Sequence, residues 1–176
     1  MHYAELQLTS NFSFLRGGSH PDELAITAAA LGLSAIAITD RNSLAGVVRA
    51  HIAAKAAGIR LVVGARLDLQ ENISLLCFPT DRAAYGRLSQ LLTVGRRRAP
   101  KGDCWLNLED VFAHDQDQIF VVLPKQTMAA EPDDAFTAQL QQLSQRWPGR
   151  CYLAGHYLYS GDDRRRLAHL AKLAMD

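Results

Sequence analysis

The sequence predicts an α/β fold, because short apolar strands alternate with longer amphipathic segments along most of its 176 residues. The clearest strand, SAIAITD at residues 34–40, is almost entirely apolar, as expected of a strand that is buried on both faces. The segment SLAGVVRAHIAAKAAG at residues 43–58 is rich in alanine and ends at a glycine, as helices commonly do. Because helical crossovers join strands that run in parallel, we expect mainly parallel pairing.

The first part of the chain contains two strand–helix units. Residues 3–9 alternate polar and apolar side chains and are expected to form the first strand. A helix is expected at residues 21–32, and Ser19 can cap it. The strand at 34–40 and the helix at 43–58 form the second unit.

The remaining sequence continues this alternation. Apolar runs predict further strands at residues 59–70, 73–79, 118–124 and 150–155. Apolar residues at helical spacing predict helices at residues 80–98, 107–114, 133–147 and 161–175. Thr80 or Asp81 can cap the first of these helices.

Composition and charge exclude several classes of protein. With 48% hydrophobic and 21% charged residues, the chain is globular rather than disordered. Its net charge of +1 gives no overall electrostatic attraction to nucleic acid, so any contact with DNA must be local or indirect. The three cysteines include no CxxC pair, which argues against a disulfide framework or a zinc knuckle. The sequence has neither a signal-peptide pattern nor a run of about 18 apolar residues, so we expect a cytoplasmic protein without membrane contact.

Three stretches of the sequence resemble a known family. They are ELQLTSNFSFLRGGSHPDEL, LGLSAIAITDRNSLAGVVRAHIAAKAAGIRLVVGARL and DRAAYGRLSQLLT. Together they are similar to the N-terminal polymerase-and-histidinol-phosphatase (PHP) domain of bacterial C-family DNA polymerases, which include error-prone polymerases and DNA polymerase III alpha subunits. The resemblance implies a distorted (β/α)7 barrel. Residues 1–176 would be the N-terminal portion of this barrel, a single incomplete domain truncated before its last strands.

The resemblance also implies a metal centre, most of whose ligands are replaced in this sequence. Active members carry His-x-His at the end of the first strand, Thr-Asp-His after the second and Gly-x-Glu after the third. Their metal ions generate a hydroxide that attacks phosphate esters. The corresponding positions here are Gln7, Thr9, Asp40, Arg41 and Arg66. Only the aspartate matches, and a guanidinium group remains charged and repels cations. We therefore expect no metal and no phosphoesterase activity in this segment.

Asp40 itself has alternative roles. It could be a relic ligand, or it could accept backbone N–H bonds where the chain turns into the next helix, which is a common role of aspartate. If the second and third strands are parallel neighbours, their ends meet on one face. An ion pair of Asp40 with Arg41 or Arg66 is then expected, with hydrogen bonds from Gln7 and Thr9.

One local basic cluster could contact a phosphate backbone. It is the segment GRRRAPK, with Arg96, Arg97, Arg98 and Lys101. No aromatic residue lies beside it in the sequence to stack on bases. We therefore expect weak, salt-sensitive DNA binding by this chain alone.

The resemblance implies that the segment belongs to a DNA-directed DNA polymerase of error-prone replication and DNA repair. Such an enzyme uses DNA, deoxynucleoside triphosphates and two Mg²⁺ ions, and its catalytic aspartates would lie beyond residue 176. Other replication or translesion proteins could be its partners. Within this chain we expect no catalytic residue and no cofactor, but a structural role that supports the polymerase. The alternatives are a free-standing metal-dependent phosphoesterase or proofreading exonuclease, and a stand-alone interaction module.

Overall fold

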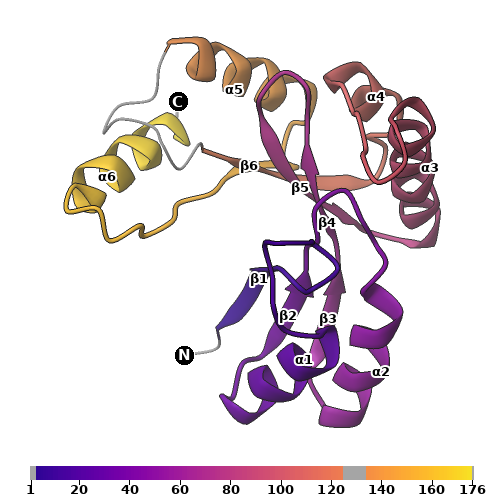
Figure 1. Ribbon diagram of the computed structural model, residues 1–176. Coiled ribbons are helices and arrows are strands. Elements are labelled where there is room, and N and C mark those ends of the chain that lie inside the picture. The colour runs from indigo at the N-terminus through magenta and orange to yellow at the C-terminus, as the bar shows by residue number, and fades with distance from the viewer. Residues whose placement is uncertain (1–2, 125–133, 176) are drawn as a thin grey trace.

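A computed structural model describes residues 3–124 and 134–175, which form two sheets with helices packed around them (Figure 1). The strands are β1 (Ala4–Leu8), β2 (Ala35–Ile38), β3 (Arg60–Val63), β4 (Ala65–Asp68), β5 (Ser74–Pro79), β6 (Gln118–Leu123) and β7 (Cys151–Leu153). The helices are α1 (Pro21–Ala30), α2 (Val47–Ala57), α3 (Arg82–Arg98), α4 (Leu108–Ala113), α5 (Asp134–Arg146) and α6 (Asp163–Leu173). Each predicted element is present with shifted ends, except that the single strand predicted at 59–70 is two strands. Position 133 of the predicted helix at 133–147 lies outside the described residues.

The first sheet has the strand order β1-β2-β3, and both of its pairings are parallel, as predicted. Every residue of β2 is buried. Helices α1 and α2 pack against this sheet at the bottom of Figure 1, and their alanines Ala25, Ala28 and Ala54 form a core with Ile36 and Ile59. Small side chains allow the helices to approach the sheet closely, so this unit is held together by close packing.

Of the two helix caps predicted from the sequence, the structure confirms the one at the start of α3. Asp81 caps α3, where its carboxylate accepts a hydrogen bond from the Ala84 N–H at 2.7 Å. The expected Ser19 cap of α1 is wrong, because His20 occupies that position. The His20 N–H donates to the carboxylate of Glu23 at 2.7 Å. A side chain in the first turn of the helix thus provides the hydrogen-bond acceptor for the backbone N–H of the N-cap residue.

The second sheet has the order β4-β5-β6-β7 and is mixed. Strand β5 pairs antiparallel with both β4 and β6, whereas β6 and β7 are parallel. The expectation of mainly parallel pairing is therefore wrong for this sheet. The physical reason at β4 and β5 is the tight turn that joins them, which is too short for a helical crossover and requires antiparallel strands.

The predicted strand at 59–70 is divided at Gly64 into β3 and β4, which belong to different sheets. A Cβ atom at Gly64 would lie 2.6 Å from the Phe78 ring, so only glycine fits where the chain crosses. The sheets remain joined by backbone hydrogen bonds. The Arg66 N–H donates to the Asp40 carbonyl at 3.1 Å, and the Asn42 N–H donates to the Arg66 carbonyl at 2.7 Å.

The largest core lies between the second sheet and helices α3, α4 and α5. It includes the fully buried Trp147, whose ring stacks on Phe120 with 3.9 Å between centroids. A smaller cluster with Ala37, Leu76 and Phe78 packs the two sheets against each other. The cysteines are free, and no helix within the described ranges is long and apolar enough to cross a membrane. The two sheets therefore meet across a packed junction, and the predicted site residues lie at that junction.

Candidate functional site

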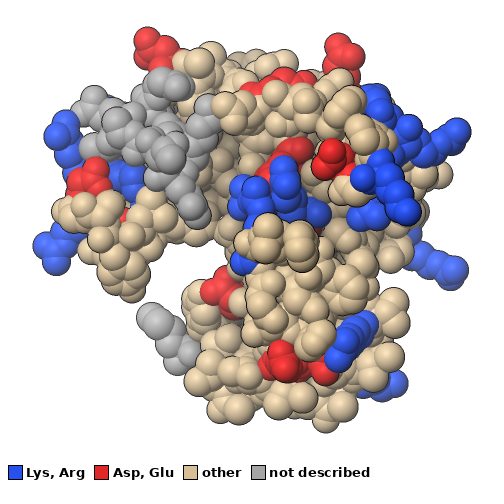
Figure 2. All heavy atoms as spheres, in the orientation of Figure 1, with Lys and Arg blue, Asp and Glu red and all other residues tan. Residues whose placement is uncertain are grey.

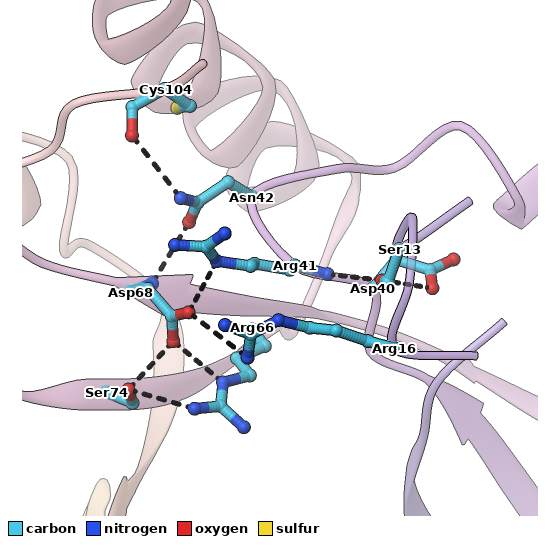
Figure 3. A network of polar contacts seen from close by, with 9 residues as sticks. All are labelled: Ser13, Arg16, Asp40, Arg41, Asn42, Arg66, Asp68, Ser74 and Cys104. Atoms are coloured by element: carbon cyan, nitrogen blue, oxygen red, sulfur yellow. Dashed lines mark hydrogen bonds and ion pairs between the residues drawn. The ribbon is translucent and has the colours of Figure 1, made fainter. Parts of the chain in front are cut away.

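The structure brings the predicted metal-site residues to the junction of the two sheets, near the carboxyl ends of β1 and β2. Figure 3 shows three of them, Asp40, Arg41 and Arg66. Gln7 and Thr9 lie at the end of β1, and Asp40 and Arg41 follow β2. Arg66 lies in β4, where its backbone forms a parallel bridge with Arg41. The predicted meeting of strand ends is thus observed, although it depends on β4 rather than on β3.

Asp40 is buried, with 1% exposure, and its carboxylate is surrounded by neutral donors. The Ser10 N–H and Oγ donate to it at 2.8 and 2.7 Å, and the Ser13 Oγ donates at 2.7 Å. The expected ion pair of Asp40 with Arg41 or Arg66 is wrong, as is the expected bonding to the start of the next helix. The loop after β1 carries Ser10 and Ser13 and folds over the end of β2. These serines supply the hydrogen bonds that the buried Asp40 carboxylate requires.

The arginines instead converge on Asp68 (Figure 3). Arg41 Nε lies 2.6 Å from Oδ2, Arg66 Nε lies 2.7 Å from Oδ1, and the Ser74 hydroxyl donates to Oδ1 at 2.7 Å. Arg16 Nη1 is 3.8 Å from Oδ2. Burial raises the pKa of Asp68, but hydrogen bonds from Arg66, Ser74 and Arg41 outweigh it, so the net pKa is lowered. The carboxylate is therefore held ionised between arginines.

The sequence reasoning missed Asp68. The signal was present in ARLDLQ, where Arg66 and Asp68 are two residues apart. In a strand, such residues lie on the same face and can pair. Their side chains do form an ion pair within β4.

Asn42 connects the network to the neighbouring segments. Its Oδ1 accepts from the Asp68 N–H at 3.0 Å, and its carbonyl accepts from Arg96 Nη2 at 3.0 Å. Its amide nitrogen donates to the Cys104 carbonyl at 3.5 Å. The residue is buried and has φ of 47°, a left-handed conformation that asparagine tolerates better than most residues. One side chain thus ties the end of β2 to β4 and to the segment after α3.

Gln7 contacts a histidine that the sequence did not single out. Its Oε1 lies 2.5 Å from His156 Nε2. Burial lowers the pKa of His156, and the charges of Arg166 and Arg66 lower it further. Thr9 is half-buried, and its side chain has no hydrogen bond within the described part of the chain. The expected network of Gln7 and Thr9 with Asp40 is therefore absent from the described contacts, and Gln7 binds His156.

These residues do not fit a metal cluster. Guanidinium groups cannot ligate cations, and the carboxylates of Asp40 and Asp68 are already engaged by hydrogen-bond donors. Within residues 3–124 and 134–175, no group of three His, Cys, Asp or Glu side chains could hold a metal ion. The geometry instead supplies fixed positive charge and hydrogen-bond donors.

A pocket of about 580 Å³ lies beside the Asp68 network. Only part of the predicted basic cluster lines this pocket. Arg96 and Lys101 line it, whereas Arg97 is exposed elsewhere on α3. Arg98 forms a bidentate ion pair with Asp110, at 2.6 and 2.9 Å. Figure 2 shows Lys and Arg side chains gathered at the middle of this face, where the two sheets meet. The pocket thus brings Arg96 and Lys101 of the basic cluster beside Arg41, one of the predicted metal-site positions.

Comparison with solved structures shows the fold. A putative metal-dependent phosphoesterase from Bifidobacterium adolescentis superposes with a TM-score of 0.68 at 16% identity, and the match covers 98% of this chain and 84% of that protein. An amidohydrolase from Chromobacterium violaceum, solved with bound sulfate and no metal, gives 0.65 at 17% identity, over 96% of this chain and 82% of that protein. The fold is thus a mixed α/β fold of the kind expected for a partial PHP barrel.

Comparison of sequences identifies the family. The error-prone DNA polymerase of Caulobacter vibrioides is 51% identical over 97% of this chain, and error-prone DNA polymerase 2 of Agrobacterium fabrum is 47% identical over 99%. The chain spans only 16% of the length of each of these relatives. The family model for the PHP domain matches residues 5–147. This chain therefore belongs to the PHP domain family.

Proposed function

We propose that this chain is the N-terminal PHP region of an error-prone DNA-directed DNA polymerase, in which it is a structural domain rather than a hydrolase. The similarity to two error-prone polymerases over almost the whole chain supports this placement. The DNA, the Mg²⁺ ions and any replication or translesion partners would then be engaged by the longer protein. The chain's own contribution is a packed support.

The observation that carries the structural role is the Asp68 network. Arg41 and Arg66 occupy positions where active relatives would hold metal ligands, and both bind Asp68 through Nε at 2.6 and 2.7 Å. Positive charge fixed by such bonds opposes cation binding, because arginine does not deprotonate. The Arg41–Asp68 bond also joins the end of β2 to β4 and so strengthens the junction of the sheets, whereas the Arg66–Asp68 bond lies within β4.

A phosphoesterase role is disfavoured by the same residues. The hydrolysis of a phosphate ester at neutral pH by this fold would need a metal-activated hydroxide, and the donor set at the junction does not fit a metal. The similarity to a putative metal-dependent phosphoesterase is at 16% identity and concerns the fold alone.

Two measurements test this function. Elemental analysis of the 176-residue chain, purified without chelator, is expected to find no stoichiometric Mn, Fe or Zn, and phosphatase and exonuclease assays with added Mn²⁺ are expected to read zero. In the longer polymerase, Asp68→Asn is expected to lower the melting temperature while leaving the KM for deoxynucleoside triphosphates unchanged. Mn²⁺-dependent hydrolysis by this chain would contradict the structural role.

A further inference from the structure

We propose that the pocket beside Asp68 binds a nucleotide, with its phosphate on the basic side chains and its base against the exposed aromatic rings. This goes beyond a supporting role and does not depend on it, because the pocket is formed entirely within this chain. The ligand is a phosphate-bearing nucleotide, which is either free or the phosphorylated end of a DNA strand.

The charge of the pocket is the first support. Arg16, Arg41, Arg96 and Lys101 line it, against the carboxylates of Asp68 and Asp103. Arg66 also binds Asp68 from outside the lining, so this carboxylate is already shared between several guanidinium groups. Positive charge therefore exceeds negative charge in the pocket, which favours an anion.

Several donors in the pocket are available for a ligand. Within the described residues, Arg41 bonds a side chain only through Nε, and the side chain of Arg16 makes no hydrogen bond, only the 3.8 Å ion pair with Asp68. Lys101 is exposed and has no side-chain hydrogen bond or ion pair in the same part of the chain. Guanidinium and ammonium groups with free N–H bonds are the usual ligands of phosphate oxygens in proteins.

The pocket is held in shape by the residues described above. Ser13 donates to the buried Asp40 carboxylate and accepts from the Arg41 N–H at 2.9 Å, which fixes the loop that carries Arg16. The Asn42 carbonyl accepts a hydrogen bond from Arg96 at 3.0 Å. Asp68 orients Arg41 through the Arg41 Nε (Figure 3). Because these side chains are positioned before a ligand arrives, less conformational entropy is lost on binding.

Aromatic rings supply the second, independent support. Phe12, Phe14 and Trp105 line the same pocket and are 43%, 84% and 42% exposed. The other tryptophan, Trp147, is fully buried in the core, so exposure is particular to Trp105. The sequence placed no aromatic beside the basic cluster, but the fold brings three to it. Basic and aromatic side chains together are the combination that binds nucleotides by phosphate contact and base stacking.

Calorimetric titration of the 176-residue chain at low salt tests this pocket. The probes are dAMP, deoxyadenosine, inorganic phosphate, and a short oligothymidylate with and without a 5′-phosphate. We expect one dAMP per chain, weaker binding of inorganic phosphate and no binding of deoxyadenosine. Tighter binding of the phosphorylated oligonucleotide than of dAMP would assign the pocket to a strand end, and the reverse order would assign it to a free nucleotide.

Matched variants locate the binding. Lys101→Gln and Arg16→Gln are each expected to weaken dAMP binding roughly tenfold, the effect of losing one charge-assisted contact. Arg97→Gln removes the same charge from a neighbouring position outside the pocket and should change affinity less than about twofold, since surface charges act weakly at a distance. Trp105→Leu should weaken dAMP binding and leave inorganic phosphate binding unchanged.

Three results would overturn the nucleotide pocket. They are no binding of any phosphorylated probe, equal binding of dAMP and deoxyadenosine, and equal losses in Lys101→Gln and Arg97→Gln. Lys101 is exposed and its side chain makes no hydrogen bond or ion pair within the described ranges, so its variant should fold normally. A circular dichroism melt confirms this for each variant.

Discussion

Arg41 Nε lies 2.6 Å from Asp68 Oδ2, although Arg41 is the sequence neighbour of the Asp40 carboxylate. The two aspartates consequently have different partners. Asp40 is buried among neutral serine donors, and Asp68 is bound by arginines. The effect of removing the Asp40 carboxylate should therefore differ from the effect of removing the Asp68 carboxylate.

Asp68→Asn is expected to destabilise the fold by about 1–3 kcal/mol, because Arg41 and Arg66 lose a charged acceptor. Urea unfolding followed by circular dichroism measures this free energy. The matched control is Asp117→Asn, which breaks the ion pair with Arg87 but concerns a side chain that is 48% exposed. Its cost should be about 0–1 kcal/mol. Equal losses in the two variants would show that the Asp68 network adds nothing beyond a surface ion pair.

Asp40→Ala is expected to cost at least about 1–3 kcal/mol, because the buried Ser10 and Ser13 donors lose their acceptor. Since these partners are neutral, the loss should be the same at low and high NaCl concentration, unlike that of an ion pair. The control Asp103→Asn alters an exposed side chain and should change stability by less than about 0.5 kcal/mol. A loss at Asp40 that shrinks in high salt would indicate a charged partner.

The free energy of unfolding should decrease as the pH drops below about 6.5, because His156 is protonated less readily in the folded chain than in the unfolded chain. Burial lowers the pKa of this histidine from its ordinary value of 6.5. Below that value the unfolded chain takes up a proton that the folded chain does not, so the free energy of unfolding decreases until the pH reaches the lowered pKa. Urea unfolding between pH 7.5 and about 5 measures the slope.

His156→Gln should flatten this slope, because it removes the titrating group. The control His51→Gln, on the exposed face of α2, should leave the slope unchanged. An equal slope in the native chain and in His156→Gln would contradict the assignment.

Asn42→Ala is expected to cost about 1–3 kcal/mol, because the side chain loses its bonds to Asp68 and Cys104. Alanine also tolerates the φ of 47° poorly. Asn42→Gly loses the same bonds without that backbone strain, so it should retain about 1 kcal/mol more stability than the alanine variant. Thermal melts of the two variants separate the backbone effect from the hydrogen bonds, and identical melts would exclude strain at this position.

The sequence determined the local elements and the chemistry available to them. The apolar run at residues 34–40 predicted the fully buried β2. Thr80 or Asp81 before an amphipathic segment predicted the cap of α3, which Asp81 provides. The resemblance also predicted that Arg41 and Arg66 stand at positions of metal ligands, and this stays a prediction. The strand and the helix cap depend on residues that are neighbours in the sequence, through periodicity and capping, so the sequence alone predicts them.

Only the tertiary structure decided how the site is connected. The break at Gly64 sends β4 into the second sheet, and this places Asp68 between Arg41 and Arg66. Likewise, the fold joins Gln7 to His156 although 149 positions separate them. Such contacts depend on where the chain crosses between the sheets and on which hydrogen-bond donors the fold places beside a buried carboxylate. Close packing fixes these outcomes for the whole chain at once, so no short stretch of sequence contains them.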